Sequence, residues 1–263
     1  MPEQPLTDET RNSAAPGAVG WYGKLPSLGD FASRRLPHAL ATEWDTWLRA
    51  GMDELRTLNA QAWPEAFVAA PVWFFMAPAQ VTGNAVIGAL APSMDRVGRY
   101  YPLTIMAAAP HAGSTLADDA RLMTFFTGAR TAIVDARRLS MTAEELDEHV
   151  SYITPPFEVR RSETRQPSLI DDILSDLSEA SYAQQLSDDK VQLPSGEWRH
   201  CLAPQSDHSL WWVSATAREG YRDVKHRGPL NRSLFSQLFS KPAHSEQGPA
   251  SASFQARNSN DQH

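Results

Sequence analysis

Three short apolar segments follow one another in the first half of the chain with only brief connections between them. They are FVAAPVWFFMA (67–77), NAVIGALAP (84–92) and YYPLTIMAAAP (100–110), and Pro, Gly or Asn residues bound them. Short apolar runs with such boundaries are typical of β-strands, and the turn at 82–84 would join the first two. Strands that cluster instead of alternating with helices predict a mixed or antiparallel sheet with helices packed on it.

Hydrophobic periodicity supplies the other elements of this α/β (α+β) fold. Further strands are expected at 18–25 and 209–215, and helices at 40–58, 116–134, from 142, at 169–177 and at 230–239. Thr42 and Ser114 are positioned to cap the first two helices, and Thr142 with Glu145 forms a capping box for the third. The sequence shows no internal repeat, so a single sheet flanked by helices is the expected architecture.

Composition limits the domain organisation and the class of protein. The chain has 263 residues, a net charge of −7 and 42% hydrophobic residues, which is enough for a sizeable core. We expect one domain at 19–240 between two disordered polar tails at 1–18 and 241–263, since the tails are poor in aliphatic residues. The acidic balance argues against a nucleic-acid partner. Neither a secretory signal nor an apolar stretch long enough to span a bilayer is recognised, so we expect a cytoplasmic protein without direct membrane insertion.

The segment GWYGKLPSLGDF (20–31) has some features of a phosphate-binding loop. A P-loop requires a Ser or Thr directly after its Lys to hold magnesium, but Leu25 follows Lys24. Ala18 also stands where the first Gly of that loop would be. The segment is better explained as a glycine-bounded turn whose aromatic residues are buried in the sheet.

A metal site near the end of the chain is a weak alternative. His200, Cys201 and His208 could supply three ligands, but their spacing is unlike that of known zinc sites. As the only cysteine, Cys201 excludes an intramolecular disulfide. We therefore interpret it as a buried thiol beside two surface histidines, and we expect no metal or other cofactor.

The segment PSMDRVGRYYPL (92–103) has two explanations. Arg and Tyr are enriched among interface hot spots, so this charged loop could contact a partner. Alternatively, it is a local connection between strands in which Asp95 pairs with a nearby Arg and Gly98 supplies a positive φ. The residues alone favour the local connection.

Trp211 and Trp212 are adjacent in a predicted strand, which places one ring on each face of the sheet. The outward ring is either covered by a helix or belongs to an exposed apolar patch.

Together these segments resemble the TagF family of type VI secretion-associated proteins. The resemblance rests on GWYGKLPSLGDF, SRRLP (33–37), the Trp-Asp-x-Trp-Leu helix at 44–48, APVWFF (70–75), PSMDRVGRYYPLT (92–104) and SLWW (209–212). The resemblance extends from Val19 to Trp212. It is weak over 155–200 and in both tails. It corresponds to the stand-alone form of the family, without a phosphatase domain. The resemblance implies an αβα sandwich with a mostly antiparallel sheet.

The resemblance also implies a function. It suggests a non-enzymatic, post-translational repressor of bacterial type VI secretion that binds a forkhead-associated scaffold protein of the apparatus. The oligomeric state of the protein stays open. Two alternative functions also stay open: a hydrolase-like enzyme with an unrecognised site, and a structural subunit of the secretion machine.

We expect the partner to contact a charged face formed by the 23–35 and 94–99 loops. Its candidate residues are Lys24, Asp30, Arg34, Arg35, Asp95, Arg96 and Arg99. The competing explanation is that Asp30 and Arg99 pair with each other inside the fold and have only a structural role.

Overall fold

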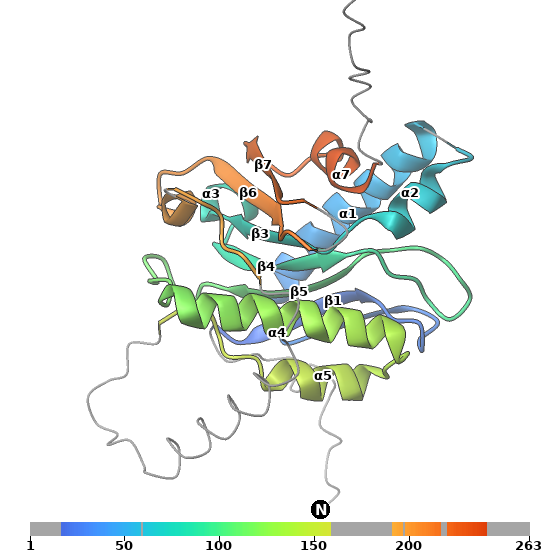
Figure 1. Ribbon diagram of the computed structural model, residues 1–263, viewed down its shortest axis with the longest axis horizontal. Helices are drawn as coiled ribbons and strands as arrows, with labels where there is room; N and C mark the ends of the chain where they lie inside the picture. Colours follow the sequence, from blue (N-terminus) through green and yellow to red (C-terminus); the bar gives the residue numbers. More distant parts are fainter. Residues whose placement is uncertain (1–16, 59, 159–190, 197, 217–219, 241–263) are drawn as a thin grey trace, which may run out of the picture.

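The computed structural model describes residues 17–58, 60–158, 191–196, 198–216 and 220–240. Within these ranges the chain forms one seven-stranded sheet in the order β2-β1-β5-β4-β3-β6-β7 (Figure 1). The strands are β1 (Val19–Lys24), β2 (Phe31–Arg34), β3 (Trp73–Ala77), β4 (Val86–Ala91), β5 (Leu103–Ala108), β6 (His208–Val213) and β7 (Arg222–Arg227). Every neighbouring pair is antiparallel, so the predicted sheet is confirmed.

Helices cover both faces of the sheet and make three layers (Figure 1). They are α1 (His38–Leu58), α2 (Trp63–Ala69), α3 (Ala79–Thr82), α4 (Asp119–Arg138), α5 (Ala143–Ser151), the 3-10 helix η2 (Trp198–Leu202) and α7 (Arg232–Phe239). The α4 and α5 helices pack on one face, and α1, α2 and α7 pack on the other. None of the helices in the described ranges is both long and apolar enough to cross a membrane.

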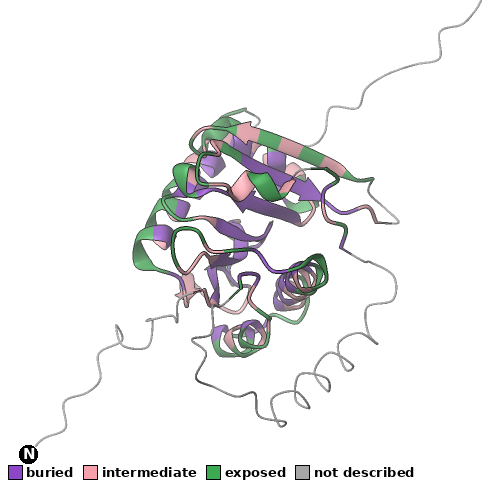
Figure 2. Ribbon diagram, turned by 90° about the vertical axis from the view of Figure 1, so that its left-hand side faces the viewer, coloured by how far each residue is buried: buried purple, intermediate pink, exposed green. Residues whose placement is uncertain are grey.

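The central strands are apolar on both sides because each side contacts a helical layer. The Phe74 and Trp212 rings pack against Phe126 of α4, whereas Phe75 and Trp211 pack against Trp44 of α1. Both tryptophans at 211 and 212 are fully buried, so the outward ring is covered by a helix. Figure 2 shows this buried interior between the two layers, with an edge strand whose residues alternate in exposure.

Four details differ from the sequence prediction. Residues 67–69 belong to α2, and the strand begins only at Trp73. Thr42 does not cap α1, because the helix begins at His38 and the Thr42 hydroxyl donates to the His38 carbonyl. Asp118, rather than Ser114, caps α4 by accepting from the Arg121 amide. The sequence prediction also missed the edge strands β2 and β7.

Other predictions agree with the structure or lie outside it. The predicted capping box of α5 is formed by Thr142 and Glu145, and the helix predicted at 230–239 is α7. The predicted helix at 169–177 and the predicted tails at 1–18 and 241–263 lie outside the described residues, apart from positions 17 and 18.

Candidate functional site

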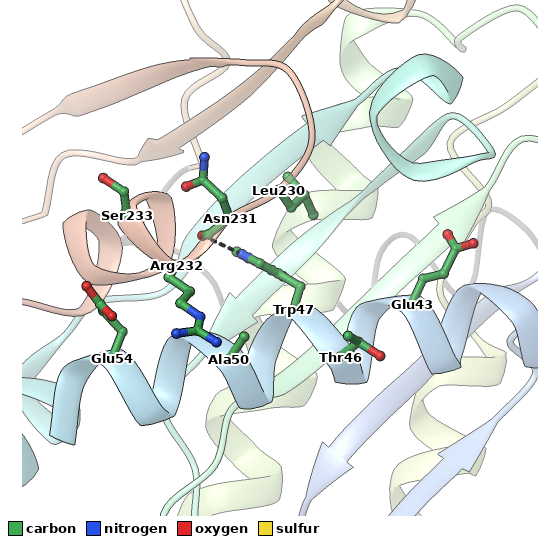
Figure 3. Close-up of a pocket in the computed structure, with 9 residues that line it drawn as sticks. All are labelled: Glu43, Thr46, Trp47, Ala50, Glu54, Leu230, Asn231, Arg232 and Ser233. Carbon is green, nitrogen blue, oxygen red and sulfur yellow. Dashed lines mark hydrogen bonds between the residues drawn. The ribbon is translucent and has the colours of Figure 1, made fainter. Parts of the chain in front are cut away.

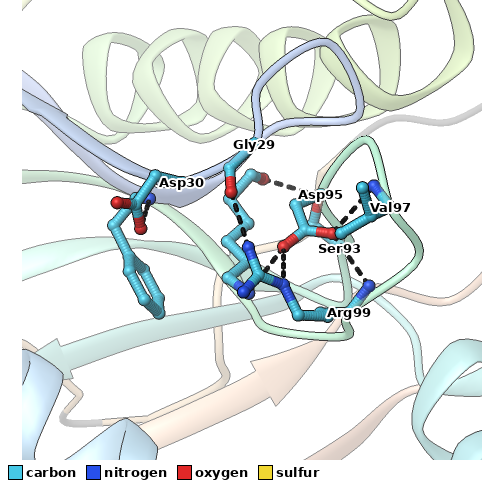
Figure 4. Close-up of polar contacts among 8 residues, drawn as sticks. Gly29, Asp30, Ser93, Asp95, Val97 and Arg99 are labelled. Carbon is cyan, nitrogen blue, oxygen red and sulfur yellow. Dashed lines mark hydrogen bonds and ion pairs between the residues drawn. The ribbon is translucent and has the colours of Figure 1, made fainter.

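The two sequence segments that resemble TagF most strongly meet at one end of the sheet. Residues 25–30 connect β1 to β2, and residues 92–102 connect β4 to β5; we call these two connections the loop pair. They lie together because β1 and β5 are antiparallel neighbours. The Arg96 amide donates to the Leu28 carbonyl at 2.8 Å. The Ser93 hydroxyl donates to the Lys24 carbonyl at 2.8 Å (Figure 4). The loop pair is therefore one packed unit.

An ion cluster around the buried carboxylate of Asp95 holds the loop pair together. Lys24 Nζ lies 2.9 Å from Asp95 Oδ2, and Arg99 Nε lies 2.7 Å from the same oxygen. The other oxygen of Asp95 accepts the backbone amides of Val97 and Arg99. Arg99 Nη2 also donates to the Gly29 carbonyl at 2.6 Å, which ties the second loop to the first (Figure 4).

Electrostatics keep the Asp95 carboxylate ionised. Burial alone would favour its neutral form, since Asp95 is 2% exposed. Hydrogen bonds from Lys24 and from the backbone and side chain of Arg99 outweigh that effect and hold the pKa of Asp95 well below its usual range. The cluster is thus a charged structural link between the two loops.

Two glycines give the loop pair its shape. Gly98 has a φ of +81° at the tip of the second loop, so the predicted local connection is confirmed in both its ion pair and its turn. Gly23 has a φ of +146°, and a Cβ there would lie 2.3 Å from the Pro102 carbonyl oxygen. A side chain at Gly23 would therefore separate β1 from β5 where the loop pair begins.

A second polar cluster, which the sequence analysis missed, lies beside the loop pair. The Asp45 carboxylate of α1 accepts the hydroxyls of Tyr22 and of Tyr101, the latter at 2.7 Å, and pairs with Arg49 at 2.6 Å. Burial and the Asp45 carboxylate raise the pKa of both tyrosines. The Phe31 ring lies 4.6 Å from the guanidinium of Arg49. Helical spacing places Asp45 and Arg49 on one side of α1, but nothing in the sequence pairs that side with the tyrosines.

Three of the predicted site residues, Asp30, Arg96 and Arg99, are exposed on the loop pair. The Asp30 carboxylate accepts the amide of Phe31. Within the described residues neither Asp30 nor Arg96 forms an ion pair, so the considered pairing of Asp30 with Arg99 is not found. The neighbouring Val97 is 67% exposed, which leaves an apolar tip between charged groups.

Arg34 and Arg35 lie at the other end of β2, next to α5. Arg35 Nη2 donates to both the carbonyl and the carboxylate of Asp147, which also accepts the indole N–H of Trp21. Arg35 adopts a φ of +57°, which is uncommon for a residue with a side chain. Arg34 approaches Glu144 at 3.8 Å. The seven candidates thus divide into a loop-pair group of five and a helix-contacting group of two.

A shallow groove lies on the outer side of α1, away from the ion cluster. It has a volume of about 630 Å³ and runs between α1 and the start of α7 (Figure 3). Trp47 forms part of its wall and donates its indole N–H to the Asn231 carbonyl (Figure 3). Its charged lining residues are Glu43, Glu54 and Arg232.

The possible metal ligands do not converge. Cys201 lies in η2, and its thiol donates to the carbonyls of Met76 and His208. Burial raises the pKa of this thiol to about 11, which disfavours the thiolate that a metal requires. In the part of the chain that the structure describes, no cluster of three or more His, Cys, Asp or Glu residues could hold a metal ion.

Comparison with known proteins identifies the family. A search of the curated proteins found no similar sequence. The crystal structure of PA0076 from Pseudomonas aeruginosa PAO1 has the same fold, with a TM-score of 0.59 and 27% sequence identity over 85% of this chain and 94% of that chain. The model of the TagF N-terminal domain, described as type VI secretion system-associated, matches residues 20–153, about half of the chain. This match includes the whole loop pair and both polar clusters, the one around Asp95 and the one around Asp45. The chain therefore belongs to the TagF N-terminal domain family of type VI secretion-associated proteins.

Proposed function

We propose that this protein is a non-enzymatic, post-translational repressor of bacterial type VI secretion. It acts in the cytoplasm by binding a forkhead-associated scaffold protein of the secretion apparatus. Sequestration of that scaffold keeps the machine from assembling or firing until a signal releases it. The family match links the chain to type VI secretion, and it supports the assignment of the protein to that system.

The observation that carries the proposal is the arrangement of the loop pair. The two most family-like segments of the sequence pack into one unit, and the ion cluster of Lys24, Asp95 and Arg99 fixes its shape. The same unit leaves Asp30, Arg96 and Val97 exposed. A surface that is fixed before binding loses little conformational entropy on association, which favours specific recognition.

The candidate residues take different roles in this proposal. Arg96 and Asp30 contact the partner directly, together with the exposed part of Arg99. Lys24 and Asp95 are buried and act by positioning the loops. Arg34 and Arg35 lie beside α5, so they stand outside the main contact surface.

Affinity purification from a bacterium that encodes a type VI system tests the binding. The protein serves as bait, and mass spectrometry identifies what is retained. We expect a forkhead-associated protein to be recovered by the wild type and lost with Arg96→Glu. Arg138→Glu is the matched control, because Arg138 is an exposed arginine on α4 at the other face of the sheet. Arg35 is unsuitable for charge reversal, since its guanidinium bonds to Asp147 and the change would disturb the fold.

A secretion assay separates repression from a structural role. Deletion of a repressor raises the release of a type VI substrate, and Arg96→Glu should have the same effect while the protein level stays normal. Deletion of a structural subunit abolishes release instead. Recovery of no secretion component, or loss of secretion on deletion, would overturn the proposal.

A further inference from the structure

The second half of α1 carries two arginines that the sequence analysis did not single out. Arg49 and Arg56 are seven residues apart, which is close to two helical turns, so they project from the same side of α1. The Arg49 guanidinium lies 4.6 Å from the centre of the Phe31 ring, and the Arg56 guanidinium lies 5.3 Å from the centre of the Trp63 ring. Each arginine is thus stacked on an aromatic residue of a neighbouring element.

Ring contacts connect these two arginines to the loop pair. The Trp63 ring meets Tyr100 at a centroid distance of 5.7 Å, and the Phe31 ring meets Tyr101 at 4.7 Å. Tyr100 and Tyr101 directly follow Arg99 in the second loop. In Figure 1 the turn between β1 and β2, the connection between β4 and β5, and the α1–α2 corner lie at the same end of the molecule. We call the group Arg49, Arg56, Arg96 and Arg99, with the rings of Phe31 and Trp63, the arginine surface.

The arginine side chains of the arginine surface are well exposed. The side chains of Arg49, Arg56 and Arg99 are 54%, 50% and 61% exposed. Asp95, the partner of Arg99, has a fully buried side chain, and that of Asp45, the partner of Arg49, is 24% exposed. These two acids therefore lie mostly beneath the arginines they bind. Asp53, the partner of Arg56, is 69% exposed.

We infer that the arginine surface binds an acidic segment of the protein partner. This inference rests on the proposed function and names the chemistry that the partner presents. Guanidinium groups bind carboxylates through two parallel hydrogen bonds, and a group already stacked on a ring is oriented before binding. The rings and Val97 supply apolar contact between the charges, a combination of residue types that is frequent in interface hot spots.

A direct test uses a hexaglutamate peptide as the probe and the full chain at low salt. Nuclear magnetic resonance follows the Nε–Hε signals of the arginines during the titration. We expect the signals of Arg49, Arg56, Arg96 and Arg99 to shift along a common saturation curve. The reference is Arg138, which is 73% exposed and pairs with an acid three residues away, as Arg56 does. Equal shifts at Arg138, or no shift at the four arginines, would overturn the inference.

A second test uses the forkhead-associated protein itself. We expect the double variant Arg49→Gln, Arg56→Gln to weaken its binding roughly tenfold and to reduce the dependence of Kd on salt. Arg138→Gln should leave both unchanged. If the wild type binds and the double variant binds equally well, the acidic-partner inference fails and the proposed function stands. If the wild type does not bind the scaffold but the hexaglutamate shifts are present, the proposed function fails and the acidic preference of the surface stands.

Discussion

The two ends of β2 carry similar charged residues but use them differently. At the loop-pair end, Lys24 and Arg99 converge on the buried carboxylate of Asp95, and Arg96 stays exposed. At the other end, Arg35 reaches across to Asp147 and fixes α5 against the sheet. Within the described residues, only the loop-pair end combines an internally satisfied ion cluster with an exposed arginine, Arg96, that forms no ion pair.

The two ends therefore differ in which charges are available to a partner. A charge that is paired and buried contributes to the shape of a surface, whereas an exposed charge without a partner can contribute to recognition. On this basis the loop-pair end is the candidate interface, and the α5 end is a structural contact.

Removal of the buried carboxylate should have the largest effect. Asp95→Ala leaves Lys24 buried without its counter-ion and the amides of Val97 and Arg99 without an acceptor. Breaking a buried pair in this way costs about 3–5 kcal/mol in the free energy of unfolding. Urea denaturation followed by tryptophan fluorescence measures the loss. A change below about 1 kcal/mol would show that the cluster does not hold the loops.

The same cluster should make stability sensitive to acid. The folded-state pKa of Asp95 is lowered, so its contribution is fully present above the unfolded-state pKa of about 4. That contribution is lost as the pH falls through the lower, folded-state value. Asp95→Asn should therefore flatten the acid limb of a plot of unfolding free energy against pH. An acid limb with the same slope in both proteins would contradict this assignment.

At the other end of β2, Arg35 should give a smaller loss that depends on the replacement. Arg35→Ala removes the bonds to Asp147 and keeps a side chain at a φ of +57°, which should cost about 2 kcal/mol. Arg35→Gly removes the same bonds but relieves the backbone strain, so it should be less destabilising by about 1 kcal/mol. Thermal melts of the two variants compare them directly. Equal stabilities would mean that the backbone there is not strained.

The central fold was predictable because its strands are apolar and short. Residues 84–92 and 209–215 are marked by β-prone residues with clear boundaries, and both form central strands. The edge strands were not predictable in the same way. Phe31–Arg34 has only four half-buried residues, and Arg222–Arg227 is mostly charged. An edge strand packs on fewer neighbours and often carries charges, so it lacks the apolar pattern.

The candidate site was predictable as two segments but not as a network. The sequence alone favoured a pair between Asp95 and a nearby Arg, and the structure contains it with Arg99. Lys24 lies 71 residues from Asp95 in the chain, and no local pattern reports such a contact. The same holds for Arg35 and Asp147, whose pairing depends on how α5 packs on the sheet.

A smaller effect on stability is expected at Arg96. Arg96→Glu changes an exposed side chain that forms no ion pair with any described residue, so the free energy of unfolding should change by at most about 0.5 kcal/mol. Binding of the partner should nevertheless be lost, because the reversed charge repels an acidic surface. Arg138→Glu is the control for both measurements. A large loss of stability in Arg96→Glu would assign that residue to the fold instead.

The smallest effect is expected for the coupling between Asp30 and Arg99. Asp30 is exposed and, among the described residues, bonds only to the amide of Phe31, whereas Arg99 bonds to Asp95 and Gly29. A double-mutant cycle with Asp30→Ala and Arg99→Ala should therefore give an interaction energy near zero. The matched cycle with Asp95→Ala and Arg99→Ala should give about 1 kcal/mol or more, since that pair shares a charge-assisted hydrogen bond. If the first cycle gave the larger coupling, Asp30 would belong to the structural cluster, and the part of the loop pair that can face a partner would shrink to Arg96 and Val97.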